Sequence, residues 1–282
     1  MLVYAALLKL ALAYQCFLKS SGSKISIFGT MARKKSLFLL MLVPFIWSVG
    51  FGQINPQDSA IFAPILNFHY SYQFPGADMA KRFGDNHNIG ASFVIKTKSN
   101  VVFGVEGSFL FGTNVREDPL SIYRVENGKI VSEGGTYANI AILQRGFSVN
   151  ARVGKIFSIL SPNPNSGPYI YAAAGYLQHN IRFQVDRNTV PFLREDYVGG
   201  YDRLTSGIQF SQFIGYRYFS NNRLVNFYIG YEFSQGITQN RRPFNFDQRK
   251  ADNNTRSDLL QGVRFGWSIP LYKKTPREFY YN

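Results

Sequence analysis

The sequence has 282 residues, enough for one or two domains; 16% are aromatic and only 17% are charged. A mean hydropathy of −0.13 argues against a bundle of membrane helices, and the single cysteine, Cys16, leaves the rest of the chain without disulfides or thiolate metal sites. The net charge is +14, but the basic residues are scattered over predicted loops and strand ends. They therefore favour contact with anionic lipid headgroups rather than with nucleic acid.

Residues 31–52 have the pattern of a secretory signal peptide. A basic start after Met31 is followed by an apolar run of 11 residues, Leu37 to Trp47, which is too short to span a bilayer as a helix. Gly50 and Gly52 suit a signal peptidase, so we expect cleavage before Gln53. A signal peptide acts at an N-terminus, and residues 1–30 are therefore interpreted as lying upstream of the true start, although residues 1–18 are apolar enough for a membrane helix.

From Ile61 onward, apolar and polar residues alternate with the period of a β-strand. In the first stretch, for example, Phe68 and Tyr70 fall on one face, and His69 and Ser71 fall on the other. The pattern predicts eight strands, at 61–74, 88–97, 101–112, 143–157, 169–183, 204–219, 224–237 and 257–271.

The connections between these strands alternate in length. Long ones fall at 75–87, 113–142, 184–203 and 238–256, and shorter ones at 98–100, 158–168 and 220–223. Outer-membrane barrels have short periplasmic turns and long outer loops. Residues 53–282 are therefore predicted to form an all-β, eight-stranded antiparallel up-and-down transmembrane β-barrel. A soluble β-sandwich is the alternative, but it gives no reason for strict alternation of loop lengths.

Five charged residues fall on the polar face of the predicted strands. Because a barrel of eight strands is just wide enough for side chains to fill it, charges inside it need partners. Glu106 and Arg152 lie on neighbouring predicted strands, and so do Glu232 and Arg264, so we expect these two ion pairs. Arg217 is the fifth charge. We interpret them as a structural, salt-bridged filling of the interior; a gated pore or proton path is the alternative.

Candidates for contact with a partner lie in the last two long loops. Aromatic and arginine side chains beside aspartate on exposed loops are typical of binding surfaces. An ordered cap, in which these residues pack on one another, is the alternative. The spacing of the loop aspartates matches no calcium loop, so neither a metal nor a cofactor is expected. The candidates are Tyr201, Asp202, Arg203, Arg241, Arg242 and Asp247.

The chain has three histidines, His69, His87 and His179. A hydrolase or an outer-leaflet acyltransferase would need such residues at the outer rim. The sequence has no Gly-x-Ser-x-Gly elbow and no metal motif of fixed spacing. We therefore expect a protein that is not an enzyme.

Four segments carry a resemblance to a known family: residues 75–84 (PGADMAKRFG), 200–204 (GYDRL), 212–216 (QFIGY) and 276–281 (PREFYY). They resemble uncharacterised outer-membrane β-barrel proteins of Bacteroidota, over about residues 60–282. The general pattern is also similar to the small OmpA and OmpX barrels, without OmpA's C-terminal peptidoglycan-binding domain. The resemblance implies an outer-membrane location and no particular reaction.

Together these observations predict a non-enzymatic outer-membrane barrel with a filled interior. Its long loops would contact a surface or envelope protein, and its strands would contact outer-membrane lipid. A narrow channel for small solutes or ions is the alternative, and an outer-leaflet lipid-modifying enzyme is a more distant one.

Overall fold

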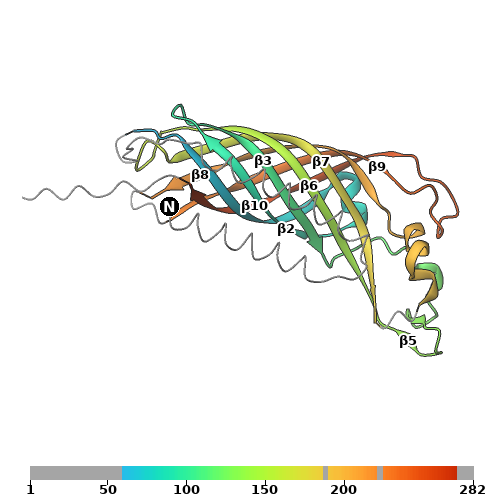
Figure 1. Ribbon diagram of the computed structural model, residues 1–282. Coiled ribbons are helices and arrows are strands. Elements are labelled where there is room, and N and C mark those ends of the chain that lie inside the picture. Colours follow the sequence, from blue (N-terminus) through green and yellow to red (C-terminus); the bar gives the residue numbers. More distant parts are fainter. Residues whose placement is uncertain (1–58, 187–189, 221–224, 272–282) are drawn as a thin grey trace, which may run out of the picture. The chain divides into compact units, whose positions relative to one another are not determined.

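The chain folds into a closed barrel of eight antiparallel strands (Figure 1). The computed structural model describes residues 59–186, 190–220 and 225–271. Each barrel strand pairs with its neighbours along the chain, so the predicted up-and-down fold is confirmed. The barrel strands are β1 (Ala63–Gly76), β2 (Asn86–Lys96), β3 (Val101–Gly112), β6 (Ile140–Ile156), β7 (Gly167–Val185), β8 (Thr205–Phe219), β9 (Asn226–Asn240) and β10 (Thr255–Pro270).

The first and last strands close the barrel. They pair continuously from Ile65 opposite Pro270 to Gly76 opposite Leu259, so neither strand is left as an edge of an open sheet. The expected signal peptide and the segment before it lie outside the described residues. No helix in the described part of the chain is long and apolar enough to cross a bilayer.

The two ends of the barrel differ. The connections after β1, β3, β7 and β9 lie at one end, here called the loop end, and those after β2, β6 and β8 lie at the other, the turn end. The connection after β1 (residues 77–85) is shorter than the one after β6 (residues 157–166), so the predicted alternation of lengths fails at this pair. The loop-end connections carry α3 (Ala77–Arg82), the 3-10 turns η2 (Ser121–Tyr123), η4 (Pro191–Leu193) and η5 (Glu195–Gly200), and a small hairpin of β4 (Ile130–Val131) and β5 (Tyr137–Ala138).

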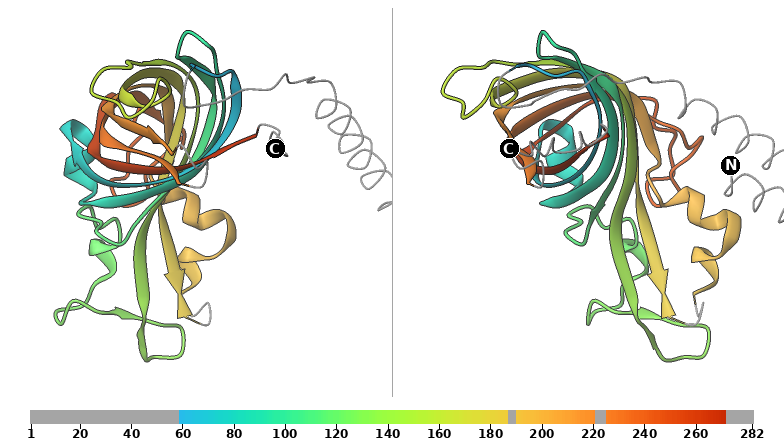
Figure 2. Two further views of the ribbon diagram at one scale, coloured as in Figure 1. Left: turned by 90° about the vertical axis from the view of Figure 1, so that its left-hand side faces the viewer. Right: turned by 60° about the vertical axis from the view of Figure 1, so that its left-hand side comes forward.

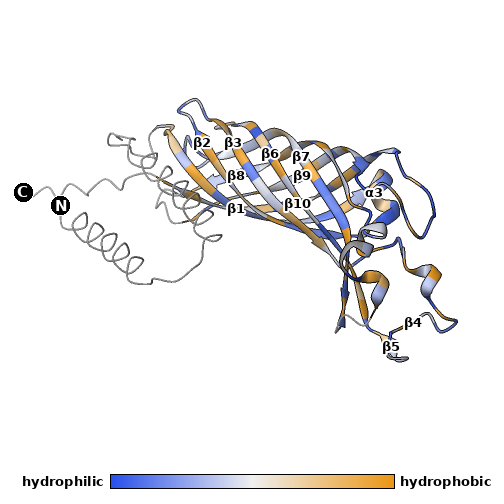
Figure 3. Cartoon of the chain, turned by 45° about the vertical axis from the view of Figure 1, so that its right-hand side comes forward, coloured by the Kyte–Doolittle hydropathy of each residue, from blue (hydrophilic) through white to orange (hydrophobic). Residues whose placement is uncertain are grey.

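Hydrophilic and hydrophobic residues alternate along the strands (Figure 3), and the burial of the side chains shows that the polar ones face the interior. On β1, Asn67 and His69 are at most 5% exposed, whereas Phe68 and Tyr70 are 48% and 45% exposed. Such an exterior would be unfavourable in water over eight strands but suits lipid.

Strands β6 and β7 are longer than their neighbours at the loop end (Figure 2). β3 pairs with β6 only as far as Gln144, and β8 pairs with β7 only as far as His179. Residues 140–143 of β6 therefore pair with β7 alone, as a two-stranded ribbon that continues past the barrel.

Candidate functional site

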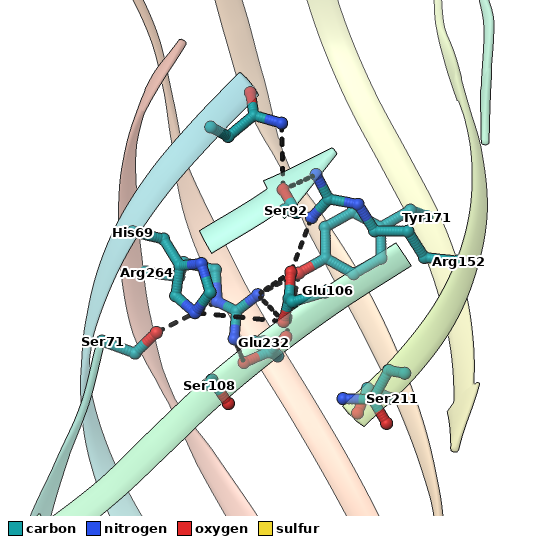
Figure 4. Close-up of polar contacts among 12 residues, drawn as sticks. His69, Ser71, Ser92, Glu106, Ser108, Arg152, Tyr171, Ser211, Glu232 and Arg264 are labelled. Carbon is teal, nitrogen blue, oxygen red and sulfur yellow. Dashed lines mark hydrogen bonds and ion pairs between the residues drawn. The ribbon is translucent and has the colours of Figure 1, made fainter. Parts of the chain in front are cut away.

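The middle of the barrel holds a buried ionic cluster, here called the central cluster (Figure 4). Arg152 Nη1 lies 2.8 Å from Glu106 Oε2, and Arg264 Nη2 lies 2.7 Å from Glu232 Oε2. The structure thus brings together both pairs proposed from the sequence. Arg264 Nη1 also lies 2.9 Å from Glu106 Oε1, so one arginine joins the two pairs into a single network.

Neutral side chains complete the central cluster. Tyr171 donates its hydroxyl to Glu232 Oε1 at 2.9 Å and accepts a hydrogen bond from Arg264 Nη1 at 2.8 Å. Ser92 accepts from Arg152 at 2.6 Å, and Ser71 accepts from Arg264 at 3.0 Å. Two arginines thus face two glutamates with most of their polar atoms occupied, which is the condition under which buried charges are tolerated.

Arg217, the fifth predicted interior charge, stands apart from the central cluster. Its side chain is fully buried near the turn end, and its Nη2 donates to Asn67 Oδ1 at 2.9 Å. The guanidinium carbon lies 4.6 Å from the ring centre of Tyr169 and 4.9 Å from that of Tyr228. Among the described residues, no carboxylate pairs with Arg217. Its guanidinium is instead in contact with aromatic ring faces and with the side-chain amide of Asn67.

The turn end of the interior is closed by apolar packing and by the β6–β7 connection. Ile65, Val94 and Ile156 are buried beneath the rings that surround Arg217. Asn165 in that connection accepts a hydrogen bond from Lys96 Nζ at 2.8 Å, and Asn163 donates to the carbonyl of Phe219 at 2.6 Å. We call this layer the inner seal.

The loop end is closed by α3, which folds back into the barrel opening. Met79 and Phe83 are fully buried and pack against Leu110, Ile181 and Leu260. Residues 75–87 were expected only as a long outer loop; apolar residues four apart, Met79 and Phe83, are the signal that favours a helix packed on one face.

Asp258 of β10 fixes α3 in place. It lies 3.2 Å from Arg82 Nη2 and 2.9 Å from His179 Nε2, and it accepts from Thr238 Oγ1 at 2.6 Å. Sequence reasoning did not single out Asp258, although its position on the polar face of the last strand could have drawn attention to it. We call α3 with these partners the outer seal.

Between the outer seal and the central cluster lies a small polar cavity. It offers about 10 Å³ to the centre of a water molecule, which is room for roughly one water. Its lining includes Gln73, Asn88, Glu106, Ser148 and Gln209. At this level of the interior, the side chains therefore leave room for little more than ordered water.

The predicted contact residues of the third long loop, 184–203, are buried. Tyr201, Asp202 and Arg203 are 3%, 5% and 2% exposed. Arg203 Nε lies 2.7 Å from Glu117 and its Nη2 lies 2.5 Å from Asp247, so one guanidinium joins three loops. The described parts of loops 113–139, 190–204 and 241–254 form one packed unit, here called the loop cap.

The remaining predicted loop residues have mixed surroundings. Arg242 binds Asp202 through Nε at 2.9 Å and through Nη2, and this hydrogen bonding raises the pKa of Arg242. Arg241 is exposed, although its Nε donates to Ser206 at 2.7 Å. Burial, and then a hydrogen bond with Tyr123, raises the pKa of Tyr201, so its hydroxyl stays neutral in the loop cap.

The outer surface of the loop cap carries large apolar side chains. They project from the long loops rather than from the lipid-facing strands. A set of this kind marks an interaction surface more often than a solvated one. Its members are Ile122 (57% exposed), Tyr137 (56%), Tyr197 (65%), Phe244 (41%) and Phe246 (40%).

The histidines lack the geometry of a catalytic site. His69 and His179 are buried within the barrel, and the hydroxyl of Thr238 bonds Asp258 rather than His179. His87 lies on the exterior, 2.7 Å from the Tyr70 hydroxyl. Within the described residues, no group of three His, Cys, Asp or Glu side chains is placed to hold a metal ion.

Neither a family model nor a curated protein matches the sequence. Among solved structures, the chain is similar to Neisserial surface protein A, with 12% identity, TM-score 0.40, and coverage of 74% of this chain and 96% of that one. It is also similar to Ail, the attachment invasion locus protein of Yersinia pestis, with 13% identity, TM-score 0.37, and coverage of 75% and 99%. The N-terminal β-barrel domain of Pseudomonas aeruginosa OprF matches with 11% identity, TM-score 0.33, and coverage of 74% and 99%.

The chain is an eight-stranded up-and-down β-barrel of the transmembrane kind, on the evidence of its own strand pairing and exterior. At these identities and TM-scores, no function of the matched proteins extends to it.

Proposed function

We propose that this protein is an outer-membrane barrel with a sealed interior, whose loop cap contacts a surface or envelope protein. Support for the location comes from the apolar exterior of the strands, which range from 11 residues in β2 to 19 in β7. A tilted strand needs roughly 9–11 residues to cross a membrane.

The observation that carries the partner proposal is the exposed apolar set on the packed loop cap. Tyr197, Phe244 and Phe246 lie above a framework that Arg203 ties together through buried ion pairs. Holding aromatic side chains in place before binding reduces the entropy lost on association. Tyr201, Asp202 and Arg203 would then shape the surface from beneath rather than touch the partner.

Site-specific photo-crosslinking in intact cells tests this proposal. A photoreactive residue at Tyr197 or Phe246 should give one discrete crosslinked species, because both positions face outward from the loop cap. The same probe at the exposed Ser99, in a turn-end connection, serves as the control. A crosslinking pattern identical at all three positions would contradict a specific partner surface.

The filled interior argues against the alternative function of a narrow channel. Two seals and the central cluster lie in series along the barrel. Purified protein in a planar bilayer should therefore show no steady stepwise conductance. Regular conductance steps from the wild-type barrel would favour the channel over the sealed barrel as its function.

The buried histidines likewise weigh against an outer-leaflet lipid enzyme. His179 is 0% exposed and its partner Asp258 is 1% exposed, so a lipid substrate would have to displace α3 to reach them. Unchanged outer-membrane lipid composition after deletion of the protein is the expected result.

A further inference from the structure

The lipid-facing side of the barrel carries a belt of aromatic side chains near the loop end. His87 stacks on Phe111 with ring centres 5.4 Å apart, and Phe111 stacks on Phe109 at 6.2 Å. Phe147 lies opposite Phe109 in the strand pairing, and its ring centre is 5.9 Å from that of Tyr176. In membrane barrels, such a belt marks the level where hydrocarbon gives way to headgroups.

Two arginines project from the same face at this level. Arg145 shares the exterior face of β6 with Phe147 and lies opposite Phe111 in the strand pairing. Arg182 of β7 lies opposite Leu143, two residues along β6 from Arg145. The two side chains are therefore diagonal neighbours, a relation in which long side chains reach one another.

Neither guanidinium has an anionic partner among the described residues. Arg145 donates one hydrogen bond to the carbonyl of Gln144, at 2.8 Å, and Arg182 lies within its electrostatic reach. Asp85, an acid of the exterior two strands away, accepts hydrogen bonds from Tyr72 at 2.7 Å and Asn114 at 2.8 Å. Two like charges side by side without a counter-ion are unfavourable unless an anion comes from outside.

We infer that Arg145 and Arg182 form a binding site for the headgroup phosphate of an anionic membrane lipid. This inference rests on the membrane location proposed above. The two guanidinium forks can hold a phosphate through charge-assisted hydrogen bonds, while Phe147 and Tyr176 line the path of an acyl chain below. The lipid belongs to the leaflet at the loop end.

Native mass spectrometry of the detergent-purified, full-length barrel tests the site directly. Phosphatidic acid, whose headgroup is a phosphate monoester, is the probe, and phosphatidylcholine is the zwitterionic comparison. The wild type should retain phosphatidic acid in preference to phosphatidylcholine. The double variant Arg145→Gln/Arg182→Gln should lower the ratio of bound to free phosphatidic acid about tenfold, because both forks are lost.

A matched control removes two exposed cations elsewhere on the barrel. Lys98 lies in the β2–β3 turn and Lys155 lies on β6 near the turn end. The variant Lys98→Gln/Lys155→Gln has the same net charge as the arginine variant and should retain phosphatidic acid like the wild type. Heat-modifiable gel mobility shows that each variant is folded.

Three results would overturn the inference. One is equal retention of phosphatidic acid by the arginine variant and the wild type. The second is an equal loss in the lysine control, and the third is equal retention of phosphatidylcholine and phosphatidic acid by the wild type. Because the purified barrel is tested without a partner protein, the outcome is independent of the loop-cap proposal.

Discussion

Arg264 of β10 reaches across the barrel interior to Glu106 of β3, with its Nη1 2.9 Å from one carboxylate oxygen and 3.1 Å from the other. Two strands, β1 and β2, separate β10 from β3 around the barrel wall. This contact therefore braces the barrel across its interior, in addition to the hydrogen bonds that run around the wall.

The first prediction concerns this brace. Glu106→Ala removes the carboxylate that Arg152 and Arg264 share and leaves both arginines buried. The free energy of unfolding in urea should therefore fall by about 3–5 kcal/mol. Combining it with Arg264→Ala should cost clearly less than the sum of the single changes. Ser148→Ala, which removes an uncharged interior group, is the control. Additive costs would show that the two residues act independently.

The second prediction concerns the outer seal. Asp258→Ala removes the carboxylate shared by Arg82 and His179, so α3 should leave the barrel opening more often. Trypsin should then cleave after Lys81 faster than in the wild type. Planar bilayers should still show no conductance, since the central cluster and the inner seal remain. Asp252→Ala, which breaks an ion pair with Arg256 in the loop cap, should leave cleavage at Lys81 unchanged.

The third prediction concerns the loop cap. Arg203→Ala removes the buried guanidinium between Glu117 and Asp247. The loop of residues 241–254 should then separate from the other two loops of the loop cap. Trypsin should cut faster after Arg249 and Lys250, while heat-modifiable mobility of the barrel stays as in the wild type. Arg241→Ala, at an exposed position, is the matched control. Equal cleavage rates in the wild type and both variants would mean that Arg203 does not hold the loops together.

The fourth prediction concerns processing of the chain. The apolar run after the basic residues near Met31 ends in small residues suited to a signal peptidase. Mass spectrometry of the protein isolated from membranes should place its N-terminus at Gln53. Recovery of mature protein that still carries residues 1–30 would contradict both the expected cleavage and the expected start.

Alternation of apolar and polar residues predicted the strands, and the lengths of the connections favoured a barrel over a sandwich. Residues 101–112 were expected as a strand and are β3, and residues 143–157 correspond to β6 at 140–156. The strand period is two, so each face of a strand can be assigned from sequence. The proposed pairs Glu106–Arg152 and Glu232–Arg264 relied on the same rule, because their strands are neighbours.

Contacts across the interior could not be predicted in the same way. Arg82 meets Asp258 over 176 residues of sequence, and Glu106 meets Arg264 over 158. Such contacts depend on how far a loop turns inward and how wide the closed barrel is. The pattern of the third loop likewise indicated aromatic and charged residues but not their burial: whether Tyr201 faces outward depends on the loops packed around it.

The unequal lengths of the strands have a consequence for distance from the membrane. Residues 140–143 of β6 continue past the last residue paired with β3, which adds about 13 Å of ribbon at roughly 3.3 Å per residue. The hairpin of β4 and β5 belongs to the connection that leads into this ribbon. In the membrane location proposed above, this ribbon would carry the β4–β5 hairpin beyond the level of the lipid headgroups.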